Sequence, residues 1–133
     1  MAEASYPGDL LYHSEHDWAR VEDDGAHAVL GITWYAQDSL GEVVFFDPPE
    51  VGLTLKKDEP YTEVESVKAV SDVIAPLSGE IVEVNAGLGD SPQAINEDPY
   101  EEGWMIAIEP ADPKEVDALM DAKAYRAFVE EQE

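Results

Sequence analysis

The sequence predicts a mainly β fold with one short internal helix and a C-terminal helix. Several short runs alternate β-branched or aromatic residues with acidic ones and stop at clusters of Gly, Pro or Asp, which is typical of half-exposed strands joined by turns. One short segment, 34–40, lies between a threonine that can cap a helix and a glycine that can end one. Near the C-terminus, apolar residues recur at helical spacing: Val116, Leu119, Met120, Ala124, Phe128 and Val129.

In the first part of the chain we expect strands over Leu10–Tyr12, Trp18–Val21, Ala28–Ile32, Val43–Phe46 and Leu53–Leu55. Asp23-Asp24-Gly25 is a turn signal that joins the second and third of these strands into a hairpin. Thr33 caps the helix Trp34–Leu40, which ends at Gly41. The segment Asp47–Gly52 contains two consecutive prolines, which cannot stay in a hydrogen-bonded ladder, and it therefore ends the fourth strand.

The centre of the chain predicts a β-hairpin that presents a lysine. Tyr61–Glu65 alternates bulky and acidic residues, and Val70–Ala75 is rich in β-branched residues and stops at Pro76. Lys68 falls at the bend between these two strands. A solvated turn lysine is the simplest interpretation, but rigid strands would also hold its flexible amine away from the body of the domain. We therefore regard Lys68 as a candidate attachment point for a swinging cofactor.

The last part of the chain supplies two further strands and the C-terminal helix. We expect the strands over Glu80–Asn85 and Trp104–Ile108, with an irregular loop between them. Asp112, Pro113 and Glu115 occupy the N-cap, first and third positions of a helix over 112–131, as in a capping box. The apolar stripe of this helix is expected to pack on the outside of the β core. A chain of 133 residues suffices for one core, so we treat 1–133 as a single domain.

The composition excludes several classes of function. Seven basic and 31 acidic residues give a formal net charge of −24, which repels nucleic acid and anionic membrane surfaces and favours a monomer that meets proteins with basic docking faces. The absence of cysteine excludes disulfides, thiolate metal sites and a cysteine nucleophile. No apolar run is long enough for a transmembrane helix, and the first residues lack a secretory or transit pattern. We therefore expect a cytoplasmic protein, or a processed one from an organelle such as the mitochondrial matrix.

Other motifs in the chain were considered as metal-binding or catalytic sites. His13 and His16, together with Glu15 and Asp17, are metal ligands by type, but His-x-x-His without further partners is poor zinc spacing, and we predict no metal site. The chain has no Gly-x-Ser-x-Gly elbow of the kind that carries a hydrolase nucleophile, and no Gly-rich phosphate loop. We therefore predict no catalytic residues.

Around Lys68 the sequence resembles the H protein of the glycine cleavage system, a family of lipoyl carriers. Near the lysine the resemblance is carried by Glu65-Ser66-Val67-Lys68-Ala69, Ser71-Asp72, Ala75-Pro76, Gly79-Glu80 and Val84-Asn85. Farther away it is carried by His16-Asp17-Trp18, Gly31-Ile32-Thr33, Tyr35-Ala36-Gln37, Leu40-Gly41-Glu42-Val43-Val44, Asn96, Asp98-Pro99-Tyr100 and Gly103-Trp104. The similarity runs from about Tyr12 to Phe128 in the family's order, and several of these blocks are specific to the H protein.

The resemblance implies a lipoyl-domain-like hybrid barrel or sandwich of two antiparallel sheets, and lipoate in amide linkage to Lys68. In the family, the disulfide of the arm accepts the aminomethyl group left when glycine decarboxylase (P protein) acts on glycine. The arm passes this group to the aminomethyltransferase (T protein) with tetrahydrofolate, and dihydrolipoyl dehydrogenase (L protein) reoxidises it. The resemblance therefore implies a carrier that is not itself an enzyme. Acylation removes the charge of the lysine, so such an arm can lie on apolar surface.

The resemblance also implies roles for individual residues. Glu65 and Gly79 match positions that the family uses for recognition by the lipoylating enzymes, although Gly79 could be only a turn residue with positive φ. In the family the loaded arm folds into a cleft, where a cationic amine needs carboxylate and hydroxyl partners. The candidates for this cleft are Glu15, Asp17, Ser39 and Asp72, and surface solvation is the alternative role for each. Trp34 and Asp17 depart from the residues usual in the family, and both positions are expected to border the cleft.

Two other interpretations stay open. One is the lipoyl domain of a 2-oxoacid dehydrogenase complex, or a biotinyl domain. The former usually has aspartate before its lysine and the latter methionine on both sides, whereas Val67 and Ala69 flank Lys68 here. The other is an H-like protein whose arm relays lipoate to other enzymes, or one that keeps the fold without the arm. The intact mass of the protein and of the Lys68→Ala variant would separate a carrier from a chain without an arm.

Overall fold

The computed structural model describes residues 6–22 and 25–132. The N-terminal stretch Met1–Ser5 and the expected turn residues Asp23 and Asp24 therefore lie outside the described residues. The strands are β1 Leu11–Tyr12, β2 Asp17–Glu22, β3 His27–Ile32, β4 Val43–Phe46, β5 Thr54–Leu55, β6 Pro60–Ser66, β7 Val70–Ile74, β8 Gly79–Val84 and β9 Ile106–Pro110. The helices are α1 Trp34–Leu40, α2 Gly87–Asp90, α3 Ala94–Glu97, α4 Pro113–Asp117 and α5 Ala122–Gln132. None of these described helices has the length and apolar character needed to cross a bilayer.

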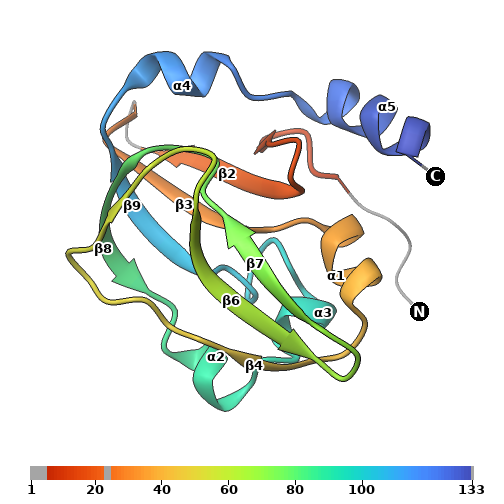
Figure 1. Ribbon diagram of the computed structural model, residues 1–133. Coiled ribbons are helices and arrows are strands. Elements are labelled where there is room, and N and C mark those ends of the chain that lie inside the picture. The colour runs from red at the N-terminus through yellow and green to blue at the C-terminus, as the bar shows by residue number, and fades with distance from the viewer. Residues whose placement is uncertain (1–5, 23–24, 133) are drawn as a thin grey trace.

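The strands form two antiparallel sheets, with α4 and α5 running along one side of the molecule (Figure 1). The larger sheet has six strands in the order β1-β2-β3-β9-β8-β5, and the smaller has three in the order β4-β6-β7. This arrangement confirms the predicted fold class, a mainly β sandwich with a short internal helix and a C-terminal helix. The expected central hairpin is β6–β7, and its tip lies at the lower right of Figure 1.

An apolar core joins the two sheets. Leu30 and Ile81 from the larger sheet and Val64 and Val73 from the smaller one are almost fully buried in the same cluster. Alternation along β6 explains this arrangement, because Val64 is buried while the glutamates on either side of it are exposed. Burial of each such side chain contributes about 1.5–3 kcal/mol. The hairpin that carries Lys68 is therefore anchored by its inner face, and its outer face is left to solvent.

A second, aromatic cluster packs α5 against the larger sheet, as expected for the C-terminal stripe, but Ala124 of the expected stripe is exposed and Tyr125, outside that stripe, is fully buried. Tyr12 and Tyr125 stack with their ring centroids 4.7 Å apart, and Tyr6 meets Tyr125 edge-on at 5.3 Å. Trp18 of β2 is fully buried in this cluster, and its indole N–H donates to the carbonyl of Pro99 at 3.0 Å. Each of these buried aromatic side chains thus has a hydrogen-bond partner or packs against another ring.

The C-terminal helix expected over 112–131 is divided into α4 and α5. Met120 leaves the helical path to pair with Tyr12, and the backbone N–H of each donates to the carbonyl of the other at 2.8 Å. The backbone of one residue cannot pair as in a strand and continue a helix at the same time. The helix is therefore interrupted at Met120, although the apolar stripe of the sequence continues across the interruption. Asp112 caps α4 as expected, but the prediction of a capping box is wrong. The Glu115 carboxylate accepts instead from the backbone N–H and hydroxyl of Ser78, both at 2.8 Å.

Two further differences from expectation exceed one residue, whereas the ends of the other strands match the expected ends to within one residue. The loop expected after Asn85 contains the single-turn helices α2 and α3, which bury Leu88 and Ile95. A helix of one turn has no repeating apolar pattern that a sequence could show. The last strand begins at Ile106 rather than at Trp104, because the carbonyl of Trp104 accepts from the side-chain amide of Asn85 at 2.7 Å.

Candidate functional site

Lys68 lies exposed at the tip of the β6–β7 hairpin, as expected. The bend is held by Ser66, which is itself buried. The Ser66 Oγ accepts the backbone N–H groups of Lys68 and Ala69 at 3.3 and 3.2 Å, and the Ser66 N–H donates to the carbonyl of Ala69 at 2.8 Å. These bonds replace the strand ladder where the chain reverses. The lysine is therefore presented on a bend of defined shape.

The tip rests on the segment that follows α1. The backbone N–H of Val67 donates to the carbonyl of Glu42 at 3.0 Å. That segment is held in turn by Asn96 of α3, whose side-chain amide donates to the carbonyl of Gly41 at 2.8 Å. Gly41 has φ +80°, and a Cβ at this position would lie 3.5 Å from the Cε of Lys68. The stem of the lysine therefore passes alongside the end of α1.

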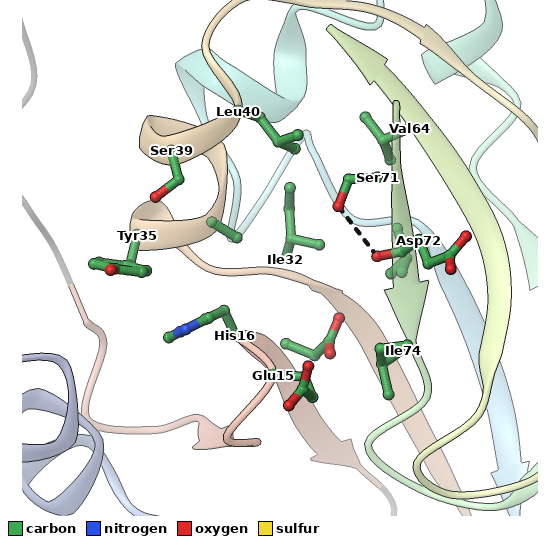
Figure 2. A pocket seen from close by; sticks show the side chains of 13 residues that line it. Glu15, His16, Ile32, Tyr35, Ser39, Leu40, Val64, Ser71, Asp72 and Ile74 are labelled. Atoms are coloured by element: carbon green, nitrogen blue, oxygen red, sulfur yellow. Dashed lines mark hydrogen bonds between the residues drawn. The ribbon is translucent and has the colours of Figure 1, made fainter. Parts of the chain in front are cut away.

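A cleft of about 290 Å³ lies between α1, the turn before β2 and strand β7 (Figure 2). Its lining residues are Glu15, His16, Asp17, Ile32, Tyr35, Ala36, Ser39, Leu40, Val64, Ser71, Asp72, Val73 and Ile74. All four residues that the sequence assigned to an arm cleft are among them. Leu40, which lines the cleft, directly precedes Gly41, which lies beside the stem of Lys68. The cleft and the lysine stem therefore meet at the same end of α1.

Asp17 is the chemically unusual group of this cleft. Its side chain is almost completely buried, and its Oδ2 has no hydrogen-bond partner within the part of the chain that the structure describes. Burial raises the pKa of the Asp17 carboxyl well above its usual range, and the nearby carboxylate of Glu15 raises it further. A buried carboxyl without a cation favours its neutral form. A positive group that entered the cleft would restore the charged form and would gain a partner by doing so.

His16 connects the cleft to α5. The residue has φ +73°, in the left-handed region, at the end of the turn before β2. Its Nδ1 lies 2.7 Å from the hydroxyl of Tyr125, and this hydroxyl lies 2.8 Å from the Oγ1 of Thr33. The ring of Tyr35 lies 4.5 Å from the imidazole, measured between centroids. The C-terminal helix thereby fixes one wall of the cleft.

The two polar residues of β7 face opposite ways. Figure 2 shows the hydroxyl of Ser71 turned toward the cleft and the carboxylate of Asp72 turned away from it, as alternation along a strand requires. Asp72 borders the cleft through its backbone, whose carbonyl accepts from the Ser71 hydroxyl at 3.4 Å. Ser39 on α1 and Glu15 in the turn before β2 are exposed at the rim. Asp72 therefore lies at the cleft through its backbone, and of these two side chains the one that faces the cleft is that of Ser71.

The two residues assigned to recognition by lipoylating enzymes lie on different sheets. Glu65 is exposed on β6, three residues before Lys68. Gly79 begins β8 in the larger sheet and is buried, and a Cβ there would fall on the carbonyl oxygen of Glu109. Its φ is not positive, so the alternative of a left-handed turn residue is wrong, and glycine is needed here for the close approach of two strands. The recognition roles themselves stay predictions.

His13 and Trp34 have surroundings that the sequence did not reveal. The Nδ1 of His13 accepts the backbone N–H of Glu15 at 3.0 Å, and its Nε2 lies 2.6 Å from the carboxylate of Asp58. Over residues 6–22 and 25–132, no group of three His, Cys, Asp or Glu is arranged to hold a metal ion. Trp34 packs against the aromatic cluster under α5 and does not line the cleft. Of the two departures from the family, only Asp17 therefore borders the cleft.

Among the residues that shape the site and that sequence reasoning missed are Ser66, Ser71 and Asn96. A signal existed for Ser66, because serine before a tight bend commonly bonds the backbone two or three residues on. A signal also existed for Ser71, since alternation places it on the same side of β7 as the buried Val73. Nothing local marks Asn96, which bonds to Gly41 at a distance of 55 positions along the chain.

The model of the glycine cleavage H-protein family matches residues 10–132. The chain belongs to this family. A glycine cleavage system H protein from Anaeromyxobacter sp. (strain K) is 59% identical over 127 residues, which are 96% of this chain and 98% of that protein. One from Bacillus subtilis (strain 168) is 50% identical over 127 residues, with the same two coverages of 96% and 98%. The crystal structure of an H protein from Mycobacterium marinum is similar with a TM-score of 0.83 at 41% identity, covering 91% of this chain and 96% of that one.

Glycine cleavage H proteins are carriers with lipoate attached covalently to a lysine. The comparisons confirm the predicted family, fold, carrier function and cofactor, and they favour this interpretation over a 2-oxoacid dehydrogenase lipoyl domain and over an H-like relay protein. The residues of this chain fit such an arm. Lys68 is exposed on a defined tip, and the cleft beside it offers apolar walls, including Ile32 and Val64, to a hydrocarbon arm. The unpartnered Asp17 carboxyl offers a place for a cation.

Proposed function

We propose that Lys68 bears the lipoyl group and that the chain is a non-catalytic carrier, which takes the aminomethyl group of glycine from one enzyme of the glycine cleavage system to the next. The observation that carries this proposal is the place of Lys68, an exposed lysine on a hairpin tip whose stem lies beside the cleft. When bound, the lipoyl group supplies a disulfide that takes up the aminomethyl group. The residues of this chain present the arm and shelter its cargo.

The proposed partners are glycine decarboxylase (P protein), aminomethyltransferase (T protein), dihydrolipoyl dehydrogenase (L protein) and the lipoylating enzymes. Each reacts with the arm or with the lysine, so the chain needs to supply no catalytic residue. A formal net charge of −24 makes copies of the chain repel one another, and we propose a monomer. Because the two relatives described above are bacterial, we place the carrier in a bacterial cytoplasm rather than in a mitochondrial matrix.

We propose that the cleft shelters the aminomethyl cargo from water. Asp17 gives up its proton and pairs with the ammonium of the cargo, since a nearby positive charge favours the ionised carboxyl. The hydroxyls of Ser71 and Ser39 and the rim carboxylate of Glu15 complete the polar surroundings of this cation. His16, held by α5, keeps the wall opposite β7 in place.

The test combines intact mass with an exchange assay. We expect protein made in a host that supplies lipoate to gain the mass of one lipoyl amide. The Lys68→Arg variant should gain none, because a guanidinium keeps the positive charge but is not acylated. Lipoylated protein should support glycine–bicarbonate exchange by purified glycine decarboxylase, and the variant should not. The assignment to Lys68 is wrong if the variant is modified, or if the parent chain never is.

A further inference from the structure

We infer that His13 and Asp58 hold two walls of the cleft together and thereby slow the loss of the cargo to water. We call this hydrogen-bonded pair the cleft clasp. Neither residue lines the cleft, so both are positioning residues for the side chains that do. The inference rests on the proposed function, because it takes the cleft to shelter an aminomethyl group. It adds two residues that keep this shelter closed.

His13 organises the turn that forms one wall of the cleft. Its backbone N–H donates to the carbonyl of Asp17 at 2.9 Å, and its carbonyl accepts the N–H of His16 at 2.9 Å. The Nδ1 of its ring accepts the N–H of Glu15 at 3.0 Å. His13 is therefore bonded to each of the three residues of this turn that line the cleft. A displacement of its ring would displace Glu15 with it.

The second nitrogen of the ring bonds to Asp58. Because Nδ1 accepts a backbone N–H, the ring proton is on Nε2, and this Nε2–H donates to the Asp58 carboxylate at 2.6 Å. The His13 side chain is 8% exposed and the Asp58 side chain is 66% exposed. A carboxylate at the surface thus holds an imidazole that the protein surrounds.

Asp58 connects this turn to the opposite wall of the cleft. It lies in the turn between β5 and β6, where its N–H donates to the carbonyl of Ala75 at 2.9 Å. The N–H of Ala75 donates in return to the carbonyl of Glu59 at 2.9 Å. Ala75 directly follows Ile74 of β7, which lines the cleft. The cleft clasp therefore joins the end of β7 to the turn before β2, although its two residues are 45 positions apart in the chain.

The backbone at position 58 does not by itself call for an aspartate. Asp58 has φ +73°, in the left-handed region, which glycine adopts more readily than any other residue. A glycine would form the same turn but would leave the Nε2–H of His13 without the carboxylate. The side chain of Asp58 therefore contributes the bond to His13 and not the shape of the turn.

The cleft clasp acts at the end of the cleft that is away from Lys68. Leu40 lies at the end beside the lysine stem, and Figure 2 shows Glu15 and Ile74 toward the other end. The carboxyl of Asp17, whose Oδ2 has no partner among the described residues, belongs to the same turn as Glu15. Without the clasp, this turn and the end of β7 can separate and admit water to the proposed cation site.

Water that reaches the cargo destroys it in a reaction that can be followed. On hydrolysis the bond between the aminomethyl carbon and sulfur breaks, and the sulfur keeps the electron pair and takes up a proton. The carbon takes the oxygen of the water and leaves as formaldehyde, and the nitrogen leaves as ammonium. This hydrolysis needs no oxidant or reductant. The rate of formaldehyde release without aminomethyltransferase therefore measures how well the cleft excludes water.

The test compares Asp58→Gly with the matched control Asp58→Asn. Both variants lose the negative charge and both residues tolerate a positive φ, but only asparagine keeps an oxygen that can accept from His13. Each lipoylated protein is loaded by purified glycine decarboxylase with glycine, separated from both, and followed for formaldehyde release. For Asp58→Gly we expect release about tenfold faster than from the parent, as for the loss of one hydrogen bond to a charged group. For Asp58→Asn we expect release within about threefold of the parent, because a neutral acceptor keeps part of the bond.

Amide hydrogen exchange of the unmodified chain is a second readout, which needs no cargo. Exchange at Glu15 and His16 should become faster in Asp58→Gly and stay near the parent rate in Asp58→Asn, because only the glycine variant releases the ring of His13. Thermal unfolding shows whether each variant is folded. If Asp58→Gly does not fold, His13→Leu replaces it, since leucine fills the space of the ring but bonds to neither partner.

Parent-like formaldehyde release from Asp58→Gly overturns the inference. Release from Asp58→Asn that is as fast as from Asp58→Gly overturns it too, because the carboxylate then acts through its charge and not by holding His13. Faster release with unchanged exchange at Glu15 has the same consequence, since the turn is then not what the pair holds. In all these cases the proposed function survives. A lipoylated parent chain that glycine decarboxylase cannot load overturns the proposed function itself, while hydrogen exchange still shows whether the pair holds the turn.

Discussion

Replacement of Asp17 by asparagine should stabilise the protein at neutral and alkaline pH and leave its stability almost unchanged in acid. Asn is close to Asp in shape but carries no charge at any pH. In the parent protein, ionised Asp17 is buried, and its Oδ2 lacks a partner among the residues that the structure describes. Unfolding releases this carboxylate into water, so deprotonation of Asp17 favours the unfolded chain.

The sign and size of the effect follow from linkage. The pKa of Asp17 is raised in the folded state, so folded protein binds more protons than unfolded protein between the usual aspartate pKa and the raised one. Asp17 makes its full contribution to the free energy of unfolding at pH values below the pKa that it has in the unfolded chain. This contribution is lost as the pH rises through the higher pKa that it has in the folded protein. Each unit by which the pKa is raised corresponds to about 1.4 kcal/mol in the free energy of unfolding. On the alkaline side, Asp17→Asn should therefore gain about this amount for each unit of the elevation.

Urea unfolding of both proteins at a series of pH values from about pH 4 to pH 8 measures the difference. The difference between the two free energies of unfolding should grow with pH above the usual aspartate pKa, because the pKa of Asp17 is raised in the folded state. Asp72→Asn, at an exposed carboxylate, controls for the removal of one charge from a chain with net charge −24. A difference that is constant over this range, or an Asp17→Asn variant that loses stability at pH 8, would refute the argument from burial.

Three other changes test the site. Tyr125→Phe removes the hydroxyl that bonds to His16 and should cost about 1–3 kcal/mol of stability in urea unfolding, because buried polar groups lose a partner. Gly79→Ala should lower the free energy of unfolding by about 1–3 kcal/mol, since its Cβ meets backbone, while Gly89→Ala, with open space around it, should have little effect. Lys68→Ala should abolish the lipoyl mass increment and change the free energy of unfolding by less than about 0.5 kcal/mol, because the side chain is exposed.

Much of the fold could be predicted because its signals are local. The helix Trp34–Leu40 and the strand Val43–Phe46 have the predicted boundaries, since a cap, a terminal glycine and a proline pair mark them in the chain. The break between α4 and α5 could not be predicted in the same way. It depends on pairing of Met120 with Tyr12, a residue from the other end of the chain, and helical periodicity continues across it.

By itself, the sequence determined the hairpin, the lysine at its tip and, through blocks spread over nearly the whole chain, the family. It also supplied the four candidate cleft residues, which the fold brings around one cavity. Only the tertiary structure decided what each of them can do. It buried Asp17 without a partner for its Oδ2 among the described residues, turned Ser71 into the cleft and Asp72 out of it, and joined His13 to Asp58. The reason is physical: residue type fixes which charges and hydrogen bonds a side chain can form, whereas burial, pKa and exposure depend on its neighbours in space.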